Sequence, residues 1–252
     1  MINHADLIIK AAYLRTQLGE DSRSPIDIFT LVQSIEKLTL VFYPMGNNLS
    51  GMCIKSDNGN SVIAINSAMT IGRQRFSLAH ELYHLYFDDT MVSVCVKSFD
   101  IDIDVEQNAD TFASYFLMPP AELEIKAKMY AEKNVDKKLT LDDIICIEQY
   151  FGISHQATVI RLKSNKYLRT ADIETFLTTG VRKRAEAIGF SPNLYLPLSE
   201  DQQFKTYGYY INQTQKIYDL GLISSGKYEE LLLDAFRADL VFGDEKGGDI
   251  ID

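Results

Sequence analysis

The chain has 252 residues, of which 46% are hydrophobic and 24% are charged, the proportions of an ordinary globular protein. Its formal net charge of −10 argues against broad affinity for nucleic acid or for anionic membranes, because both need clustered positive charge. The three cysteines are odd in number and far apart, which favours buried thiols in a reducing compartment over a disulfide framework or a Cys-x-x-Cys site.

The N-terminal segments are predicted to be helical. Residues 3–18 form the first expected helix, and Asp6 and Lys10 interrupt its apolar residues, so we expect no signal peptide and a cytoplasmic protein. No run of the chain approaches the roughly 20 apolar residues of a membrane span, so no membrane partner is expected. A second helix is predicted from Pro25 to about Leu38.

Three β-prone runs follow, LTLVFYP, SGMCIKS and SVIAINS. Turn-forming residues separate them, with Gly46-Asn47-Asn48 between the first two and Asn58-Gly59-Asn60 between the last two. Strands joined by short turns usually pair with each other in opposite directions. We therefore expect a small three-stranded antiparallel sheet.

Most of the remaining chain has helical periodicity, interrupted by proline and glycine. Helices are expected over residues 73–87, 105–118, 120–134 and, as a pair joined at Gly152, 141–165.

The order of helices, sheet and further helices indicates an α+β fold. We expect one α+β domain over residues 1–169, followed by an all-helical C-terminal portion over residues 170–252 with a break at LPLSEDQ. The role of this C-terminal portion is open, and the alternatives are substrate recognition, regulation and dimerisation.

The predicted helix at residues 73–87 contains the pattern His-Glu-x-x-His, formed by His80, Glu81 and His84. Histidines four residues apart lie on one face of a helix, so both imidazoles can reach one metal ion. Glu81 points elsewhere around the helix and can act on a water molecule without being a ligand. The alternative is a pair of core histidines that match the pattern by chance. Burial of these polar groups in so apolar a helix would need partners, and a zinc ion supplies them.

A catalytic zinc ion usually has three protein ligands and one open position, so a third ligand is expected downstream. Glu106 is the best candidate, because Ala109 and Ala113 lie on its helix face and let this helix approach the histidine helix closely. Asp110 shares that face and could accept a hydrogen bond from the outer N–H of a ligand histidine.

Other interpretations of these acidic residues remain open. Glu106 could be a solvated acid in the first turn of its helix, where the helix dipole favours it, and Asp110 an exposed helix residue. The competing candidates for the third ligand are Asp102, Asp104 and His155.

Two motifs of the chain resemble the ImmA/IrrE metallopeptidases. RQRFSLAHELYH, from Arg73 to His84, is similar to the family's R-F-T-L-A-H-E-x-x-H helix, and EQNADTFASYFLMP, from Glu106 to Pro119, is similar to its E-x-x-A-N-x-F-A-x-x-L-L-M-P helix. The resemblance covers roughly residues 24–168 and implies a zincin-like peptidase core.

The resemblance implies that His80, His84 and Glu106 bind one catalytic Zn2+ ion and that Glu81 is the catalytic base. It further implies hydrolysis of a peptide bond, in which zinc lowers the pKa of water toward about 7 and Glu81 carries the proton to the leaving amine. A second donor to the developing oxyanion is expected, and Arg73 or Arg75 is a candidate.

The chain departs from the family pattern at three positions near the motifs. Ser77 replaces a common threonine, Tyr83 a common glycine and Asp110 a common asparagine. The bulky ring of Tyr83, next to the second histidine, could narrow access to the metal.

Members of this family are similar in being site-specific cytosolic proteases, and several cut helix-turn-helix repressors. The resemblance therefore implies a protein substrate, namely a basic helix-turn-helix regulator of a mobile element or of a stress response. The negative charge of the chain is compatible with such a partner.

A rival interpretation makes the chain itself a DNA-binding regulator, because LDDIICIEQYFGISHQATVIRLK resembles a helix-turn-helix. Arg161 and other basic residues after it add local positive charge. None of the side chains that would face the bases is a strongly basic phosphate anchor, and the surrounding chain is acidic, so direct nucleic-acid binding is not expected. Those side chains belong to Ser154, His155, Gln156 and Thr158.

A third interpretation keeps the metal without turnover. The chain would then be a protein-binding module with a non-catalytic zinc site, or a protease that stays latent until a partner activates it.

Overall fold

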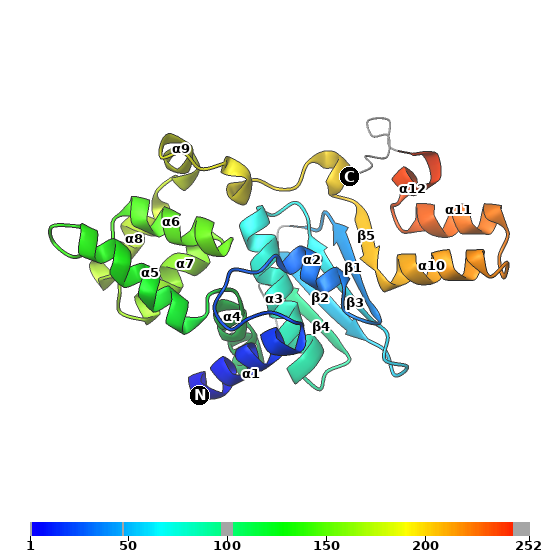
Figure 1. Cartoon of the computed structure of the whole chain (residues 1–252), viewed down its shortest axis with the longest axis horizontal. Helices are drawn as coiled ribbons and strands as arrows, with labels where there is room; N and C mark the ends of the chain where they lie inside the picture. The colour runs from blue at the N-terminus through cyan, green and yellow to red at the C-terminus, as the bar shows by residue number, and fades with distance from the viewer. Residues whose placement is uncertain (1, 47, 97–102, 244–252) are drawn as a thin grey trace.

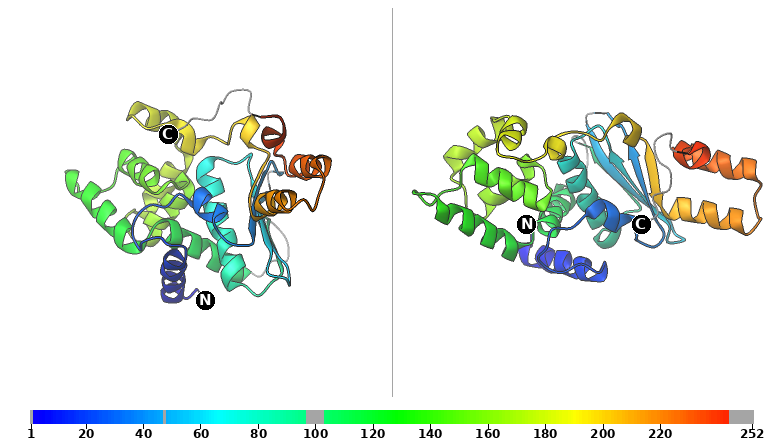
Figure 2. Two further views of the ribbon diagram at one scale, coloured as in Figure 1. Left: turned by 45° about the vertical axis from the view of Figure 1, so that its right-hand side comes forward. Right: turned by 45° about the horizontal axis from the view of Figure 1, so that its top comes forward.

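The computed structural model describes residues 2–46, 48–96 and 103–243. A β-sheet lies between two groups of helices (Figure 1), with α5 to α9 toward one end of the molecule and α10 to α12 toward the other. The two further views in Figure 2 show the same separation of the two groups. The α+β class predicted from the sequence is confirmed.

The sheet has five strands in the described chain, in the order β4-β2-β3-β1-β5. β1 and β3 run parallel, and the other neighbouring pairs run antiparallel. The prediction of a three-stranded antiparallel sheet is therefore wrong in strand number and in one pairing. The strands are β1 Leu38–Tyr43, β2 Leu49–Lys55, β3 Ser61–Asn66, β4 Val92–Val96 and β5 Lys205–Gly208.

The parallel pairing arises because the segment after β1 does not return as a hairpin. The side chain of Asn66, at the end of β3, accepts a hydrogen bond from Met45 N at 3.0 Å and donates one to Leu49 O at 2.7 Å. These bonds hold the connection across the end of β3, so β2 pairs on the far side of β3. The second predicted turn does form an antiparallel hairpin, in which Gly59 adopts a φ of +83° that favours glycine.

Helices α1 (His4–Gln17) and α2 (Ile28–Gln33) precede the sheet. The first matches its prediction, whereas the second is shorter than expected. The helix ends at Gln33, and the chain then enters β1 through Lys37, which adopts the left-handed region with a φ of 61°.

Helix α3 (Ile71–Phe87) packs against one face of the sheet, and α4 (Ile103–Leu117) packs against α3. Leu78 and Leu82 on α3 are fully buried, as are Ala109 and Ala113 on α4, so the small residues do lie where the two helices meet.

The remaining helices follow in chain order around the α3–α4 pair and at the other end of the sheet. They are α5 Pro120–Lys133, α6 Leu141–Phe151, α7 His155–Ser164, α8 Thr170–Thr178, α9 Val181–Ala187, α10 Tyr209–Asp219, α11 Ser225–Asp234 and α12 Ala238–Phe242, with short 3₁₀ helices at Pro192–Tyr195 and Glu200–Gln202.

The C-terminal portion is not all helical, contrary to the prediction. β5 pairs with β1, with Thr206 opposite Val41, and Thr206 is buried. The aromatic ring of Tyr207 packs edge-to-face against Phe42, with ring centres 6.1 Å apart. Four residues are too few for a strand periodicity to be visible in the sequence.

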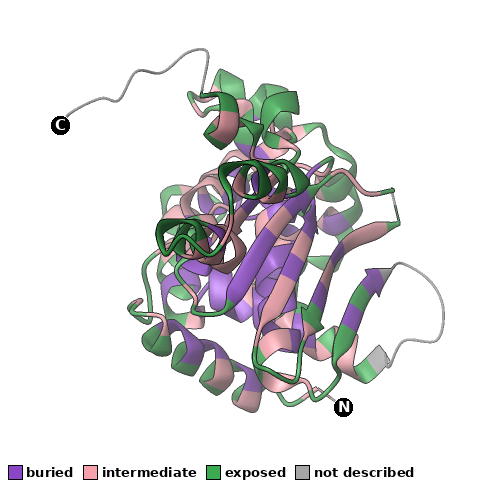
Figure 3. Cartoon of the chain, turned by 90° about the vertical axis from the view of Figure 1, so that its right-hand side faces the viewer, coloured by how far each residue is buried: buried purple, intermediate pink, exposed green. Residues whose placement is uncertain are grey.

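Burial is concentrated in the strands and in α3, and α10 to α12 carry mostly exposed residues (Figure 3). The C-terminal portion nevertheless supports the site helix, because Leu196 O accepts a hydrogen bond from Ile71 N, in the first turn of α3, at 2.7 Å. Within the described ranges, no helix combines the length and the apolar character needed to cross a membrane.

Candidate metal centre

Helix α3 carries His80, Glu81 and His84 in its buried middle, where their exposed fractions are 6%, 0% and 1%. Hydrogen bonds to backbone carbonyls fix both ends of this helix. Gln74 donates to Met69 O at 2.6 Å before the motif, and Lys55 on β2 donates to His84 O at 3.0 Å after it. The three polar side chains therefore start from a backbone that is held in place.

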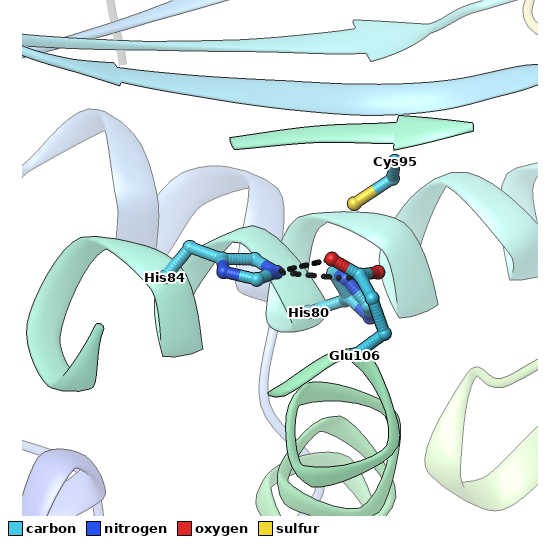
Figure 4. A group of neighbouring side chains, drawn as sticks. All are labelled: His80, His84, Cys95 and Glu106. Carbon is cyan, nitrogen blue, oxygen red and sulfur yellow. Dashed lines mark hydrogen bonds and ion pairs between the residues drawn. The ribbon is translucent and has the colours of Figure 1, made fainter. Parts of the chain in front are cut away.

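Glu106 reaches this cluster from the first turn of α4. One carboxylate oxygen lies 3.2 Å from His80 Nε2 and the other lies 3.5 Å from His84 Nε2, while the two Nε2 atoms are 3.1 Å apart. Figure 4 shows the two imidazoles and the carboxylate turned toward one another from the two helices. The three predicted ligands are thus brought together.

These separations match the size of a tetrahedral zinc site. Nitrogen and oxygen ligands about 2.05 Å from a tetrahedral zinc ion lie about 3.3 Å from one another. The observed spacings of 3.1, 3.2 and 3.5 Å fall around that value.

A carboxylate lies behind each imidazole. His80 Nδ1 is 2.9 Å from Asp110 Oδ1, and His84 Nδ1 is 2.8 Å from Asp88 Oδ2. With Nδ1–H donating to a carboxylate, the lone pair of each ring lies on Nε2 and points into the cluster. Nitrogen and carboxylate lone pairs then converge, which is unfavourable unless a cation lies between them.

The pKa values of the two histidines shift in opposite directions. Burial alone lowers the pKa of His80, but its hydrogen bonds, the largest of them with Asp110, raise that pKa well above the ordinary value. Burial lowers the pKa of His84. The carboxylates beside His80 thus favour a positive charge in the cluster, and two imidazoles with one carboxylate are a donor set of catalytic zinc sites.

Glu81 lies beside the cluster in a tightly enclosed position. Its Oε1 accepts a hydrogen bond from the Cys95 thiol at 2.8 Å, and its Oε2 is buried with no hydrogen-bond partner among the described residues. Burial raises the pKa of Glu81 to about 7. A β-carbon at Gly51 would lie 2.9 Å from Oε1, so glycine at this position of β2 makes room for the carboxylate.

A cavity of 590 Å³ opens onto the cluster, and its lining includes His80, Glu81 and Glu106. Part of its wall comes from α7, through residues such as Gln156 and Arg161. Half of the helix-turn-helix-like pair therefore borders the candidate site.

The positions predicted to face DNA bases are engaged elsewhere in this fold. Thr158 is fully buried, and His155 hydrogen-bonds to Glu148. Ser154 and Gln156 line the cavity. Arg161 is 6% exposed, and its guanidinium lies 4.0 Å from the centre of the Tyr115 ring, so it does not add positive charge to an open surface.

Of the competing third ligands, neither His155 nor Asp104 joins the cluster. His155 is bonded to Glu148 Oε2 at 2.7 Å and to the carbonyl of Phe176 at 3.0 Å. Asp104 is an exposed residue in the first turn of α4, and the carboxylate that reaches the histidines is that of Glu106. Asp102 lies outside the described residues.

Arg73 and Arg75 are the candidate oxyanion donors, and Tyr83 is the residue that could narrow access to the metal. Arg75 donates hydrogen bonds to the carbonyls of Gly152 and Ile26, whereas Arg73 lines the cavity. The ring of Tyr83 packs against Phe112, with ring centres 5.6 Å apart, and it is not among the residues that line the cavity.

Sequence reasoning missed the roles of Asp88 and Cys95. The position of Asp88, four residues after His84, could have indicated a partner on the same helix face. No local pattern indicates Cys95, because it reaches the site through the pairing of β4 with β2.

Comparison with known proteins identifies the family. A family model of the IrrE N-terminal-like domain matches residues 37–163, which is half of the chain. The chain belongs to the ImmA/IrrE family of metallopeptidases. The matched residues include His80, His84 and Glu106 and the α6–α7 pair up to Lys163, so the resemblance found in the sequence is confirmed.

One relative is the "Radiation response metalloprotease IrrE" of Deinococcus deserti, which is 35% identical over 102 residues. That match covers 38% of this chain and 34% of the relative, so the chain matches about a third of the relative's length. Membership of a metallopeptidase family implies a metal cofactor.

Proposed function

We propose that this protein is a zinc-dependent endopeptidase that hydrolyses a peptide bond in a cytosolic protein. The observation that carries the proposal is the convergence of His80, His84 and Glu106 at the spacing of a tetrahedral metal site, with the carboxylate of Glu81 beside it. The His-Glu-x-x-His pattern on one helix assigns two ligands and a base to this chemistry.

A zinc ion bound by these three side chains would act as a Lewis acid toward the scissile carbonyl and a water molecule. Glu81 is the general base, which takes a proton from the attacking water and returns it to the leaving amine. Its pKa of about 7 suits both halves of this task, because the carboxylate can accept and release a proton near neutral pH.

Asp110 and Asp88 act by positioning. Each accepts a hydrogen bond from a histidine ring and so keeps the Nε2 atom of that ring directed at the metal. Arg73 is the candidate for the second oxyanion donor, because it lines the cavity while Arg75 is bonded to backbone carbonyls.

The proposed substrate is a helix-turn-helix regulator with a basic surface. This identity comes from the family resemblance, and the net charge of −10 favours encounter with a positively charged partner. Cleavage of such a regulator would allow transcription of the genes that it represses.

The test combines metal analysis with cleavage. We expect about one zinc ion per purified chain, lost in His84→Ala and retained in Glu81→Gln. Co-expression with a helix-turn-helix regulator encoded by an adjacent gene should yield cleavage of the regulator at a defined peptide bond, which mass spectrometry locates. Glu81→Gln should abolish this cleavage.

Two outcomes contradict the assignment. Unimpaired cleavage by Glu81→Gln would remove Glu81 as the base. Zinc retained at full stoichiometry in His84→Ala would show that the metal lies elsewhere.

A further inference from the structure

A fourth group that can bind metal lies at the centre and is not needed by the proposed reaction. Cys95 is on β4, the edge strand of the sheet, and its side chain is buried. The ligand atoms of His80, His84, Cys95 and Glu106 all lie within 4.8 Å of one another. Figure 4 shows the sulfur pointing from the strand toward the three other side chains.

We propose that Cys95 is a fourth protein ligand of the metal, which closes the centre and keeps the peptidase latent until the thiolate leaves. This inference rests on the proposed function, since it concerns the regulation of the same metal site.

With Cys95 included, the side chains at the centre form a complete set of four zinc ligands. Two imidazoles, a carboxylate and a thiolate fill all four positions of a tetrahedral zinc ion, as in structural sites, whereas catalytic sites keep one position open for water or substrate. A sulfur atom and a nitrogen atom bound to the same tetrahedral zinc ion lie about 3.6 Å apart. Because the sulfur lies within 4.8 Å of each of the other ligand atoms, only a small side-chain movement is needed for it to bind the same metal ion.

Glu81 is placed to receive the proton of the Cys95 thiol. The Cys95 thiol donates its hydrogen bond to Glu81 Oε1 at 2.8 Å. Binding of sulfur to the metal would break the S–H bond, pass the proton to Glu81 and displace the water molecule from the fourth metal position, with no change of oxidation state. Closure therefore occupies the open metal position and protonates the base at once. Reopening returns the proton to sulfur and frees that metal position.

The pairing of strands places the Cys95 thiol next to the metal centre. In the pairing of β4 with β2, Cys95 lies opposite Gly51, the residue that leaves room for Glu81. The site thus has a thiol and a base side by side, placed by strand register. Cys53 on β2 is also buried, but it is not part of the group of possible ligands, which makes it a matched control.

X-ray absorption at the zinc edge tests the proposal directly on the zinc-loaded chain of 252 residues. We expect one sulfur scatterer at about 2.3 Å in addition to nitrogen and oxygen ligands at about 2.0–2.1 Å. The sulfur shell should disappear in Cys95→Ser and persist in Cys53→Ala. Cobalt substitution should give a thiolate-to-metal charge-transfer band with the same dependence on the two variants.

Metal affinity and cleavage provide further readouts. Loss of an outer hydrogen-bond partner typically weakens metal binding about 10- to 100-fold, so removal of a direct ligand in Cys95→Ser should weaken it by at least about tenfold. The same variant should cleave its substrate faster than the wild type, because its fourth position stays open.

The outcomes separate this inference from the proposed function. Zinc bound by the wild type through nitrogen and oxygen alone refutes ligation by Cys95 and leaves the endopeptidase assignment intact. Equal cleavage by the wild type and Cys95→Ser refutes latency. A protein that binds no zinc refutes the metal centre and, with it, both proposals.

Discussion

The two carboxylates behind the histidines should contribute unequally to metal affinity. The Asp88 side chain is 10% exposed and meets a histidine that is 2% exposed, whereas the Asp110 side chain is 62% exposed. Thr90 also fixes Asp88, through hydrogen bonds of 3.1 Å from its N–H and 2.7 Å from its hydroxyl. Charge that is shielded from water interacts more strongly than charge in contact with it.

Replacement by asparagine keeps an oxygen acceptor and removes the charge. Such changes typically cost 10- to 100-fold in metal affinity, which corresponds to about 1.4–2.8 kcal/mol. We expect Asp88→Asn to approach the upper end of this range and Asp110→Asn to lie at or below the lower end. Competition with a chromophoric zinc chelator at constant pH and ionic strength measures both affinities.

The order of the two losses in zinc affinity decides whether burial governs these contacts. A larger loss in Asp110→Asn than in Asp88→Asn would show that burial does not govern these contacts. Unchanged zinc affinity in both variants would show that the carboxylates do not orient metal ligands. Thermal unfolding of the metal-free variants serves as the control, because a general loss of stability would lower affinity without acting on the site.

Two further predictions concern other parts of the molecule. Gly51→Ala should lower the rate of substrate cleavage about tenfold with zinc content unchanged, because the added β-carbon would lie 2.9 Å from Glu81 Oε1 and displace the base. Cleavage at the wild-type rate would contradict this prediction. Burial lowers the pKa of His155, but the hydrogen bond with Glu148 raises it, and the net shift is above the ordinary value. The His155–Glu148 pair therefore stabilises the fold fully below about pH 6.5, and this stabilisation declines as the pH rises through the pKa of His155 in the folded state. Urea unfolding should therefore show a larger deficit for His155→Gln at about pH 6 than at about pH 9, and a deficit that grows with pH would contradict the pairing.

Sequence alone predicted the parts of the site that depend on helix periodicity. His80 and His84 are one turn apart on a single helix, so their common direction follows from local geometry. Glu106 could be chosen because Ala109 and Ala113 indicated which face of its helix would pack closely, and both residues are fully buried.

The remaining features depend on contacts between segments far apart in the chain. The parallel pairing of β1 with β3 relies on the side chain of Asn66, which bonds to Met45 and Leu49 across the end of the sheet. Cys95 meets Glu81 only because β4 adds to the edge of β2 in a particular register. Neither relationship leaves a periodic signal in the sequence, and both change the chemistry or topology around the site.

The boundary placed after residue 169 remains a prediction, and truncation tests it. Removal of residues 170–252 deletes β5 from the edge of β1 and the carbonyl of Leu196 that bonds to α3. It also removes Ile173 and Leu194, which are each 8% exposed. Burial of two such side chains contributes about 3–6 kcal/mol, a large share of the roughly 5–15 kcal/mol that stabilises a domain.

We therefore expect chain 1–169 to unfold at much lower urea concentration than the full chain and to bind zinc weakly. Chain 1–223 is the matched control, because it keeps β5, Leu196 and both buried side chains. It lacks residues 224–252, whose described part holds α11, α12 and the buried apolar residues Leu232 and Ala235. Its loss of stability should be smaller, and its zinc affinity should stay near that of the full chain. If chain 1–169 were as stable as the full chain, the C-terminal portion would be a separate unit, and the contacts of β5 and Leu196 would not support the metal helix.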